Sequence, residues 1–126
     1  MPITLMSFNT QHCQNYISKK IEFEKFAEEI RIVLANISEE KCILMGDFNI
    51  TPDDPLLVPI SSRMYDTANC FTRELLSFPS DKPEIKIDYI FTSRDIKVLS
   101  ADIPADVVSD HRPYIAVIAG ENERDI

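Results

Sequence analysis

Glycine and cysteine are scarce in this sequence, and each scarcity excludes a class of site. The 126 residues contain two glycines, Gly46 and Gly120, so the chain lacks the glycine-rich phosphate loop that flavodoxin-like binding proteins place after their first strand. The three cysteines are odd in number and show no Cys-x-x-Cys spacing, which argues against a disulfide framework and a structural zinc site. We expect them to be reduced thiols in the core.

Long apolar runs and an excess of positive charge are also absent. No stretch approaches the ~20 apolar residues of a membrane span, and residues 1–13 lack the pattern of a signal peptide, so we expect a soluble, cytoplasmic protein. The net charge of −8 disfavours a protein that binds nucleic acid through its own lysines and arginines. A nucleic-acid substrate stays an open alternative, because a divalent metal between acidic side chains and a phosphate reverses the local field.

The apolar content, 44% of the residues, is enough to bury one core in a chain of this length. Aromatic and β-branched residues recur almost to the end of the chain, where a short charged segment follows. We therefore predict a single domain over residues 1–120 and a polar tail over residues 121–126.

The apolar pattern predicts an α/β (α+β) domain with a mixed sheet. Over residues 21–37, apolar side chains recur at the spacing of one helix face, opposite a row of glutamates, which predicts one long amphipathic helix. Residues 61–84 show no clear pattern. The order of elements places the helix on one face of the sheet. Short apolar runs predict five strands, at residues 3–8, 42–45, 85–92, 96–103 and 114–119.

Four groups of polar side chains that can bind metals or transfer protons lie in these predicted strands or close to their ends. Strand ends of one sheet can converge on a single site, and carboxylate and amide oxygens are the ligands that magnesium prefers. The sequence thus suggests a Mg2+ (or Mn2+) site. The residues concerned are Asn9, Asp47 with Asn49, Asp88, and Asp110 with His111.

Each of these residues also has a structural interpretation. An Asp after a buried strand is usually a turn residue, and Asp88 could face solvent on an alternating strand. If Asp88 pairs with His111, however, the pair can stabilise negative charge that builds on a phosphoryl group. Asp47 would then orient or deprotonate a water, and the amide of Asn49 would fix that water or a phosphate oxygen. We interpret His12, which has no acidic neighbour, as a loop histidine.

Four segments, taken in order, resemble the endonuclease/exonuclease/phosphatase family of deoxyribonuclease I-like proteins. They are Met6 to Asn9, Leu44 to Asn49, Ile87 to Phe91 and Ser109 to Pro113, and the Gly-Asp-Phe-Asn and Ser-Asp-His elements within them are the most specific. The resemblance implies a metal-dependent phosphoesterase.

The resemblance also assigns a role to each candidate residue. It implies that Asn9 and Asp110 are metal ligands and that Asp47 and Asn49 handle the nucleophilic water and the phosphate. It further implies that His111, oriented by Asp88, contacts the scissile phosphate.

The sequence departs from the family pattern in its middle. Family members are typically much longer and fold as a four-layer sandwich of two sheets flanked by helices, so this chain resembles part of that fold. Two strands of the pattern do not occur here: one that ends in Leu-Gln-Glu, whose Glu is a principal metal ligand, and a later Thr-His-Leu-like strand. One sheet face would then be uncovered, and an exposed apolar face usually marks an interface. We therefore predict a homodimer, or another partner, that covers this face.

Two functional hypotheses follow. The first is a magnesium-dependent hydrolase that cleaves a phosphodiester or a phosphomonoester with a water positioned by the metal and Asp47. The second is a catalytically silent, shortened relative that acts as a binding or scaffold module. Completeness of the metal site distinguishes the two hypotheses.

Overall fold

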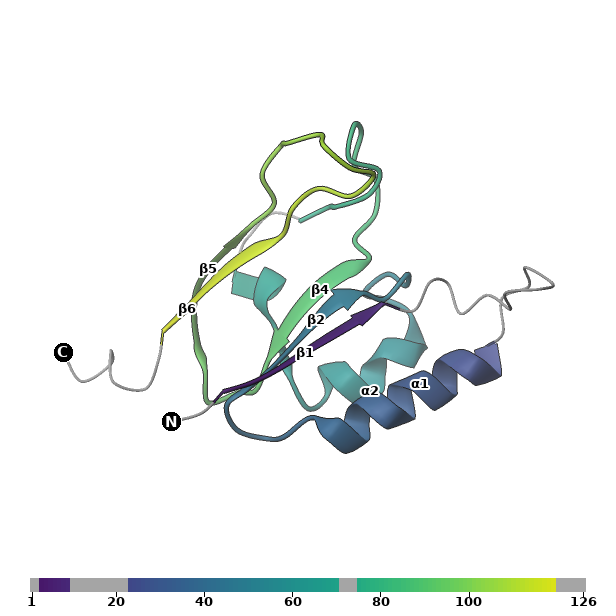
Figure 1. The fold of residues 1–126 in the computed structure, drawn as a ribbon, viewed down its shortest axis with the longest axis vertical. Coiled ribbons are helices and arrows are strands. Elements are labelled where there is room, and N and C mark those ends of the chain that lie inside the picture. Colours follow the sequence, from purple (N-terminus) through teal and green to yellow (C-terminus); the bar gives the residue numbers. More distant parts are fainter. Residues whose placement is uncertain (1–2, 10–22, 71–74, 120–126) are drawn as a thin grey trace.

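The computed structural model describes residues 3–9, 23–70 and 75–119, which form two β-sheets, two α-helices and two 3-10 helices (Figure 1). The four-stranded sheet has the order β1-β2-β4-β3, with strands β1 (Thr4–Asn9), β2 (Cys42–Asp47), β4 (Asp88–Thr92) and β3 (Tyr65–Asp66). The helices are α1 (Phe23–Asn36), η2 (Pro55–Leu57), α2 (Val58–Ser61) and η3 (Thr67–Cys70). The last two strands, β5 (Lys97–Asp102) and β6 (Ile115–Ala119), pair with each other.

The four-stranded sheet is mixed, as predicted. β1 and β2 run parallel, and the chain between them includes α1, as a crossover between parallel strands requires. β2 and β4 run antiparallel, with Asp47 opposite Asp88. The α/β fold class is thus confirmed, and the end of β2 meets the start of β4.

The sheet differs from the prediction at its other edge. The five predicted strands do not join one sheet, because β3, which the sequence pattern did not reveal, occupies the free edge of β4 through Tyr65 and Asp66. β5 follows β4 after a four-residue turn but pairs with β6 rather than with β4. The two-stranded sheet extends to one side of the larger sheet in Figure 1.

The main core lies between the four-stranded sheet and helices α1 and α2, which cover one of its faces (Figure 1). Helix α1 contributes Ile30 and Val33 to this core, and Ile37 follows directly after it. Side chains of α1 are described only from Ala27 onward, so the full amphipathic pattern over residues 21–37 stays a prediction. A smaller hydrophobic cluster consists of Leu75, Ala101 of β5 and Ile103.

Three aromatic rings form the centre of the main core. Tyr89 and Phe91 of β4 stack with 5.2 Å between ring centroids, and Phe48 packs edge-on against Tyr89 at 5.5 Å. All three side chains are almost completely buried. Because Phe48 follows Asp47 directly, this contact anchors the end of β2 in the core.

Two further expectations from the sequence have mixed outcomes. Cys42 is buried in β2, but Cys70 is exposed at the end of η3, so the prediction of a core thiol is wrong for Cys70. Cys70 ends a short 3-10 turn at the surface rather than a buried strand. Among the described residues, no helix has the length and apolar character needed to cross a bilayer.

The buried Tyr89 and the partly buried Tyr114 predict a loss of stability at alkaline pH. Tyr89 donates its hydroxyl to the carbonyl of Ile50 at 2.7 Å, and the Tyr114 hydroxyl lies 2.9 Å from the Thr67 hydroxyl. Burial raises the pKa of both tyrosines above the ordinary value of 10.0. In the unfolded chain both hydroxyls ionise near pH 10, so the stability linked to them is complete below that pH and is lost as the pH rises above it.

Each tyrosine should lower the free energy of unfolding by about 1.4 kcal/mol per pH unit in this alkaline range. Urea unfolding between about pH 9 and pH 11.5 measures this slope, and Tyr89→Phe and Tyr114→Phe should each reduce it. A Tyr89→Phe variant with the slope of the parent protein would contradict the assignment.

Candidate active site

The strand register brings two of the predicted site carboxylates together. Asp47 is the last residue of β2 and Asp88 is the first residue of β4, and the two are direct partners in the antiparallel ladder. Cβ atoms of such partners lie roughly 4.5–5.5 Å apart. Both side chains are mostly buried, with 17% and 18% of their surface exposed. The end of the sheet therefore holds a pair of acids rather than two isolated turn residues.

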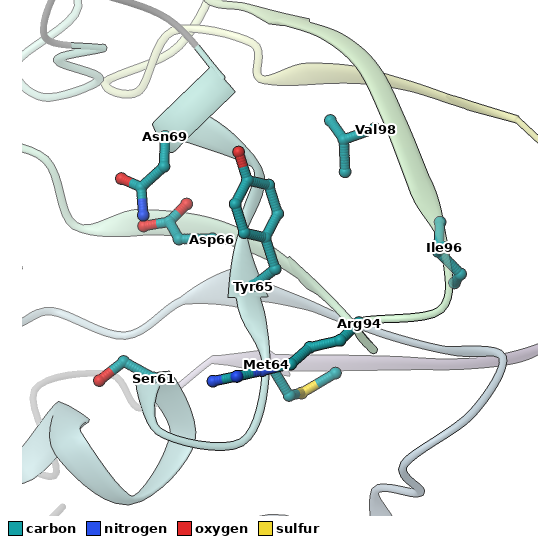
Figure 2. A pocket seen from close by; sticks show the side chains of 8 residues that line it. All are labelled: Ser61, Met64, Tyr65, Asp66, Asn69, Arg94, Ile96 and Val98. Atoms are coloured by element: carbon teal, nitrogen blue, oxygen red, sulfur yellow. The ribbon is translucent and has the colours of Figure 1, made fainter.

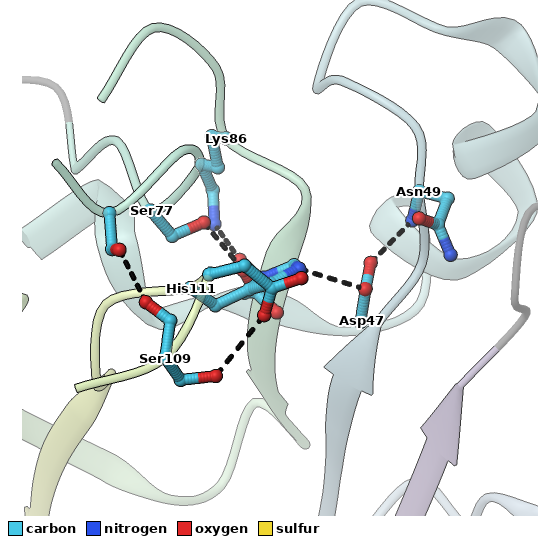
Figure 3. A network of polar contacts seen from close by, with 9 residues as sticks. Asp47, Asn49, Ser77, Lys86, Ser109 and His111 are labelled. Carbon is cyan, nitrogen blue, oxygen red and sulfur yellow. Dashed lines mark hydrogen bonds and ion pairs between the residues drawn. The ribbon is translucent and has the colours of Figure 1, made fainter. Parts of the chain in front are cut away.

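His111 contacts both carboxylates, and Figure 3 shows its contact with Asp47. Its Nδ1 atom is 2.7 Å from Oδ2 of Asp88, and its Nε2 atom is 3.4 Å from Oδ2 of Asp47. His111 comes from the loop that precedes β6, about two dozen residues beyond Asp88 in the sequence. Asp47, Asp88 and His111, predicted as site residues from the sequence, thus form one cluster.

The two acids favour the charged form of His111. Partial burial alone would lower the pKa of His111, but the hydrogen bond with Asp88 and the charges of Asp88, Asp47 and Asp110 together raise that pKa above its ordinary value. An imidazolium can donate through both ring nitrogens. If Nδ1 donates to Asp88, Nε2 is the atom that can serve a substrate oxygen.

A local turn holds Asp47 and Asn49 in place. The backbone N–H of Asn49 donates to Oδ1 of Asp47 at 2.9 Å, which is the Asx-turn geometry typical of Asp. Asn49 has φ of 58°, a left-handed conformation that Asn tolerates better than most residues. Phe48 between them is completely buried. The Asp-Phe-Asn sequence therefore has a structural reason at each of its three positions.

Residues 77–80 are hydrogen-bonded to the loop that carries His111. Ser80 donates its N–H to the carbonyl of Asp110 at 2.9 Å and its hydroxyl to the carbonyl of Ser109. Arg112 donates its N–H to the carbonyl of Ser77 at 2.8 Å and its Nε–H to the carbonyl of Ser80 at 2.7 Å. In Figure 1 the loops before β4 and before β6 meet above the sheet.

Two of the contacts of this segment reach the cluster itself. The Ser77 hydroxyl donates to Oδ2 of Asp88 at 2.6 Å, and the ring of Phe78 packs against the imidazole of His111 with 4.9 Å between centroids. The sequence analysis missed both residues, because they lie in the stretch without a clear pattern. Nothing in the sequence marks a serine as the partner of an acid eleven residues away.

Lys86 is a buried cation behind Asp88 that the sequence analysis also missed. Its side chain is 8% exposed, and Nζ donates to the backbone carbonyl of Asp88 at 2.8 Å and lies 3.6 Å from Oδ2 of Asp66. Nζ also sits 3.9 Å from the centre of the Tyr89 ring, within cation–π range. Burial lowers the pKa of Lys86, although Asp66 opposes this effect. The sequence signal that could have revealed Lys86 is its position within the apolar run before Asp88.

A pocket of about 560 Å³ has Asp66 in its wall (Figure 2). It is lined by residues of α2, β3, η3 and β5 and of the turn before β5, including Tyr65, Asp66 and Arg94. Asp47, Asp88 and His111 do not line it. Asp66 and Lys86 form the bridge between this pocket and the backbone of Asp88.

Each of the two predicted metal ligands is a backbone neighbour of one cluster residue. Asn9 is the backbone partner of Asp47 in the parallel ladder, and its side chain lies outside the described part of the structure. Asp110 precedes His111, is exposed and accepts a hydrogen bond from the Ser109 hydroxyl at 3.1 Å. His12, interpreted as a loop histidine, also lies outside the described residues.

The donors gathered here suit a hard divalent cation. Ligand atoms of Asp47, Asp88 and His111 all lie within 4.8 Å of one another, and the exposed carboxylate of Asp110 adds oxygen donors beside them. Magnesium and manganese favour such carboxylate sites, and magnesium usually takes only one or two protein carboxylates. The carboxylates of Asp47, Asp88 and Asp110 therefore fit a bound divalent cation, whereas His111 in its charged form has no lone pair for a metal.

Solved structures with similar folds come from bacteria. A functionally unknown conserved protein from Enterococcus faecalis V583 aligns with a TM-score of 0.74 and 22% identity over 96% of this chain and 51% of its own. An endonuclease/exonuclease/phosphatase from Bacteroides vulgatus aligns with a TM-score of 0.68 and 22% identity over 86% of this chain and 53% of its own. A mannosyl-6-phosphatase from Bacteroides thetaiotaomicron VPI-5482 aligns with a TM-score of 0.61 and 21% identity, covering 85% and 49%.

This chain therefore spans about half the length of the solved structures that it matches. No curated protein matches it. At the level of sequence families, the model of the Endonuclease/Exonuclease/phosphatase family matches residues 6–111, from the first strand to His111. That match covers most of the chain and includes every residue of the cluster, so the chain belongs to the Endonuclease/Exonuclease/phosphatase family.

Proposed function

We propose that this chain is a metal-dependent phosphoesterase that hydrolyses a phosphodiester or a phosphomonoester at the Asp47–His111–Asp88 cluster. One observation carries the proposal: His111 is held by Asp88 through Nδ1 while Nε2 faces Asp47. A fixed imidazolium next to a carboxylate provides a donor for a phosphate oxygen and an acceptor for the proton of a water. Family membership supports the same class of chemistry.

In this mechanism Asp47 orients the water and accepts its proton as the water oxygen bonds to phosphorus and the ester oxygen departs. His111 donates a hydrogen bond from Nε2 to a non-bridging oxygen, where negative charge accumulates in the transition state. Asp88 keeps the ring in position and in its charged form. The side-chain amide of Asn49 binds the water or the phosphate.

Asn9 and Asp110 would hold a magnesium or manganese ion beside this cluster. When bound, such an ion supplies Lewis-acid stabilisation of the phosphate oxygens. The mannosyl-6-phosphatase among the similar structures supports a phosphomonoester as one substrate class. The net charge of −8 favours a small phosphate ester over nucleic acid.

Metal-dependent hydrolysis of a bis-aryl phosphodiester and an aryl phosphomonoester by the purified chain tests this proposal. We expect magnesium or manganese to support release of the aryl alcohol, a chelator to abolish it, and Asp47→Ala to lower the rate roughly 100-fold or more. Asp95→Ala is the matched control, because Asp95 binds the backbone N–H of Lys41 beyond the opposite end of β4.

The alternative function, a catalytically silent binding or scaffold module, predicts a different result. In that case the parent chain would show no metal-dependent rate above that of Asp47→Ala with either substrate. A rate that survives both the chelator and Asp47→Ala would likewise contradict the proposal.

A further inference from the structure

Ser77 is completely buried and contacts the acid that orients His111. Its hydroxyl donates to Oδ2 of Asp88 at 2.6 Å, and the same oxygen lies 2.7 Å from Nδ1 of His111. A carboxylate oxygen can accept from two donors at once. Oδ2 of Asp88 therefore accepts one hydrogen bond from the Ser77 hydroxyl and can accept another from the imidazole of His111.

The Asp88 carboxylate needs such a partner to keep one orientation. The terminal torsion of an Asp side chain has broad, shallow minima, so the strand backbone alone does not fix the direction of its oxygens. The hydrogen bond from Ser77 selects the orientation in which Oδ2 points at His111.

The backbone of Ser77 connects the segment before β4 to the loop that carries His111. Its carbonyl accepts the N–H of Arg112, the residue after His111, at 2.8 Å, and its own N–H donates to the carbonyl of Ile85 at 3.0 Å, shortly before Asp88. One buried residue therefore links the approach to β4, the Asp88 side chain and the loop that carries His111.

We propose that Ser77 is a positioning residue that aligns the Asp88–His111 pair for catalysis, an inference that rests on the proposed function of this cluster. The hydroxyl sets the direction of the carboxylate, and the carboxylate sets the direction of the imidazole. Ser77 does not touch the substrate. Its loss should therefore lower the rate of the chemical step and leave substrate binding nearly unchanged.

Steady-state kinetics of Ser77→Ala on the bis-aryl phosphodiester test this role. We expect kcat to fall roughly 10- to 100-fold, the value of a hydrogen bond to a charged group, with KM changed by less than about threefold. Ser77→Thr restores the hydroxyl and should recover most of kcat. A folded Ser77→Thr variant as slow as Ser77→Ala would overturn the inference.

Ser93→Ala is the matched control for the loss of a buried serine. Ser93 is 1% exposed, and its hydroxyl accepts the N–H of Cys42 at 3.0 Å, beyond the opposite end of β4. This variant should lose thermal stability but keep the parent kcat. An equal loss of kcat in Ser93→Ala and Ser77→Ala would show a general effect of destabilisation and would overturn the positioning role.

A spectroscopic measurement separates this inference from the proposed function. The proton between His111 Nδ1 and Asp88 should give a downfield imidazole resonance in 15N-labelled protein, assigned by its absence in His111→Gln. We expect Ser93→Ala to retain this resonance and Ser77→Ala to lose it. If the parent chain is inactive but the resonances behave in this way, the proposed function fails and the positioning role stands. If Ser77→Ala keeps both the resonance and the parent rate, the positioning role fails alone.

Discussion

Substitution of His111 by glutamine is expected to lower kcat for phosphate ester hydrolysis roughly 100- to 1,000-fold, which is typical for the loss of one preorganised transition-state donor. Glutamine keeps a polar side chain but cannot carry the positive charge that Asp88 and Asp47 maintain on the imidazole. The measurement is single-turnover hydrolysis of the bis-aryl phosphodiester at saturating metal.

His12→Gln is the control for this prediction, because the chain has only two histidines and the sequence places His12 in a loop without an acidic partner. We expect it to keep the parent rate. Asp88→Asn should lower kcat to a similar extent as His111→Gln, and the double variant should be little slower than either single variant, because residues that act as a unit are not additive. Full activity in His111→Gln would remove the imidazole from the mechanism.

Replacement of Phe48 by alanine is expected to lower the free energy of unfolding by about 3–5 kcal/mol. The ring is completely buried and packs against Tyr89 and Phe91, so truncation leaves a cavity in the centre of the core. That loss is a large part of the total stability of a small domain, which is typically about 5–15 kcal/mol. Urea unfolding measures it directly.

Leu99→Ala provides the comparison, because Leu99 is 50% exposed on β5. This substitution should change the free energy of unfolding by less than about 1 kcal/mol. Phe48→Leu should lie between the two. A loss of less than about 1 kcal/mol in Phe48→Ala would contradict the description of the core.

The sequence predicted the parts of the fold that depend on continuous local patterns. The apolar run at Cys42–Met45 and the alternation around Asp88 correspond to β2 and β4, whose bounds differ from the predictions by a few residues. Part of the cluster was predictable for a related reason: neighbouring strands of one sheet share an end, where Asp47 and Asp88 are partners. His111 reaches this pair from the loop before β6, a contact that no strand pattern predicts.

What the sequence could not predict depends on contacts between distant segments. β3 has two residues, too few for a periodic pattern, yet it closes the edge of β4 and thereby separates β5 and β6 into another sheet. Ser77 carries no local signal of its role, because a serine gains its importance from a partner that only the fold supplies. The domain bounds and the homodimer stay predictions.

The pairing of Asp47 with Asp88 connects the candidate active site to the hydrophobic core, because both lie on one ladder of backbone hydrogen bonds between β2 and β4. Two residues beyond this pair, Met45 lies opposite Ile90, and one residue further Leu44 lies opposite Phe91 in the main core. Because side chains alternate between the faces of a strand, a shift of one residue in β4 would exchange its inner and outer side chains. Small insertions in β2 or β4 therefore cannot change the spacing of the two acids without also displacing side chains of the hydrophobic core.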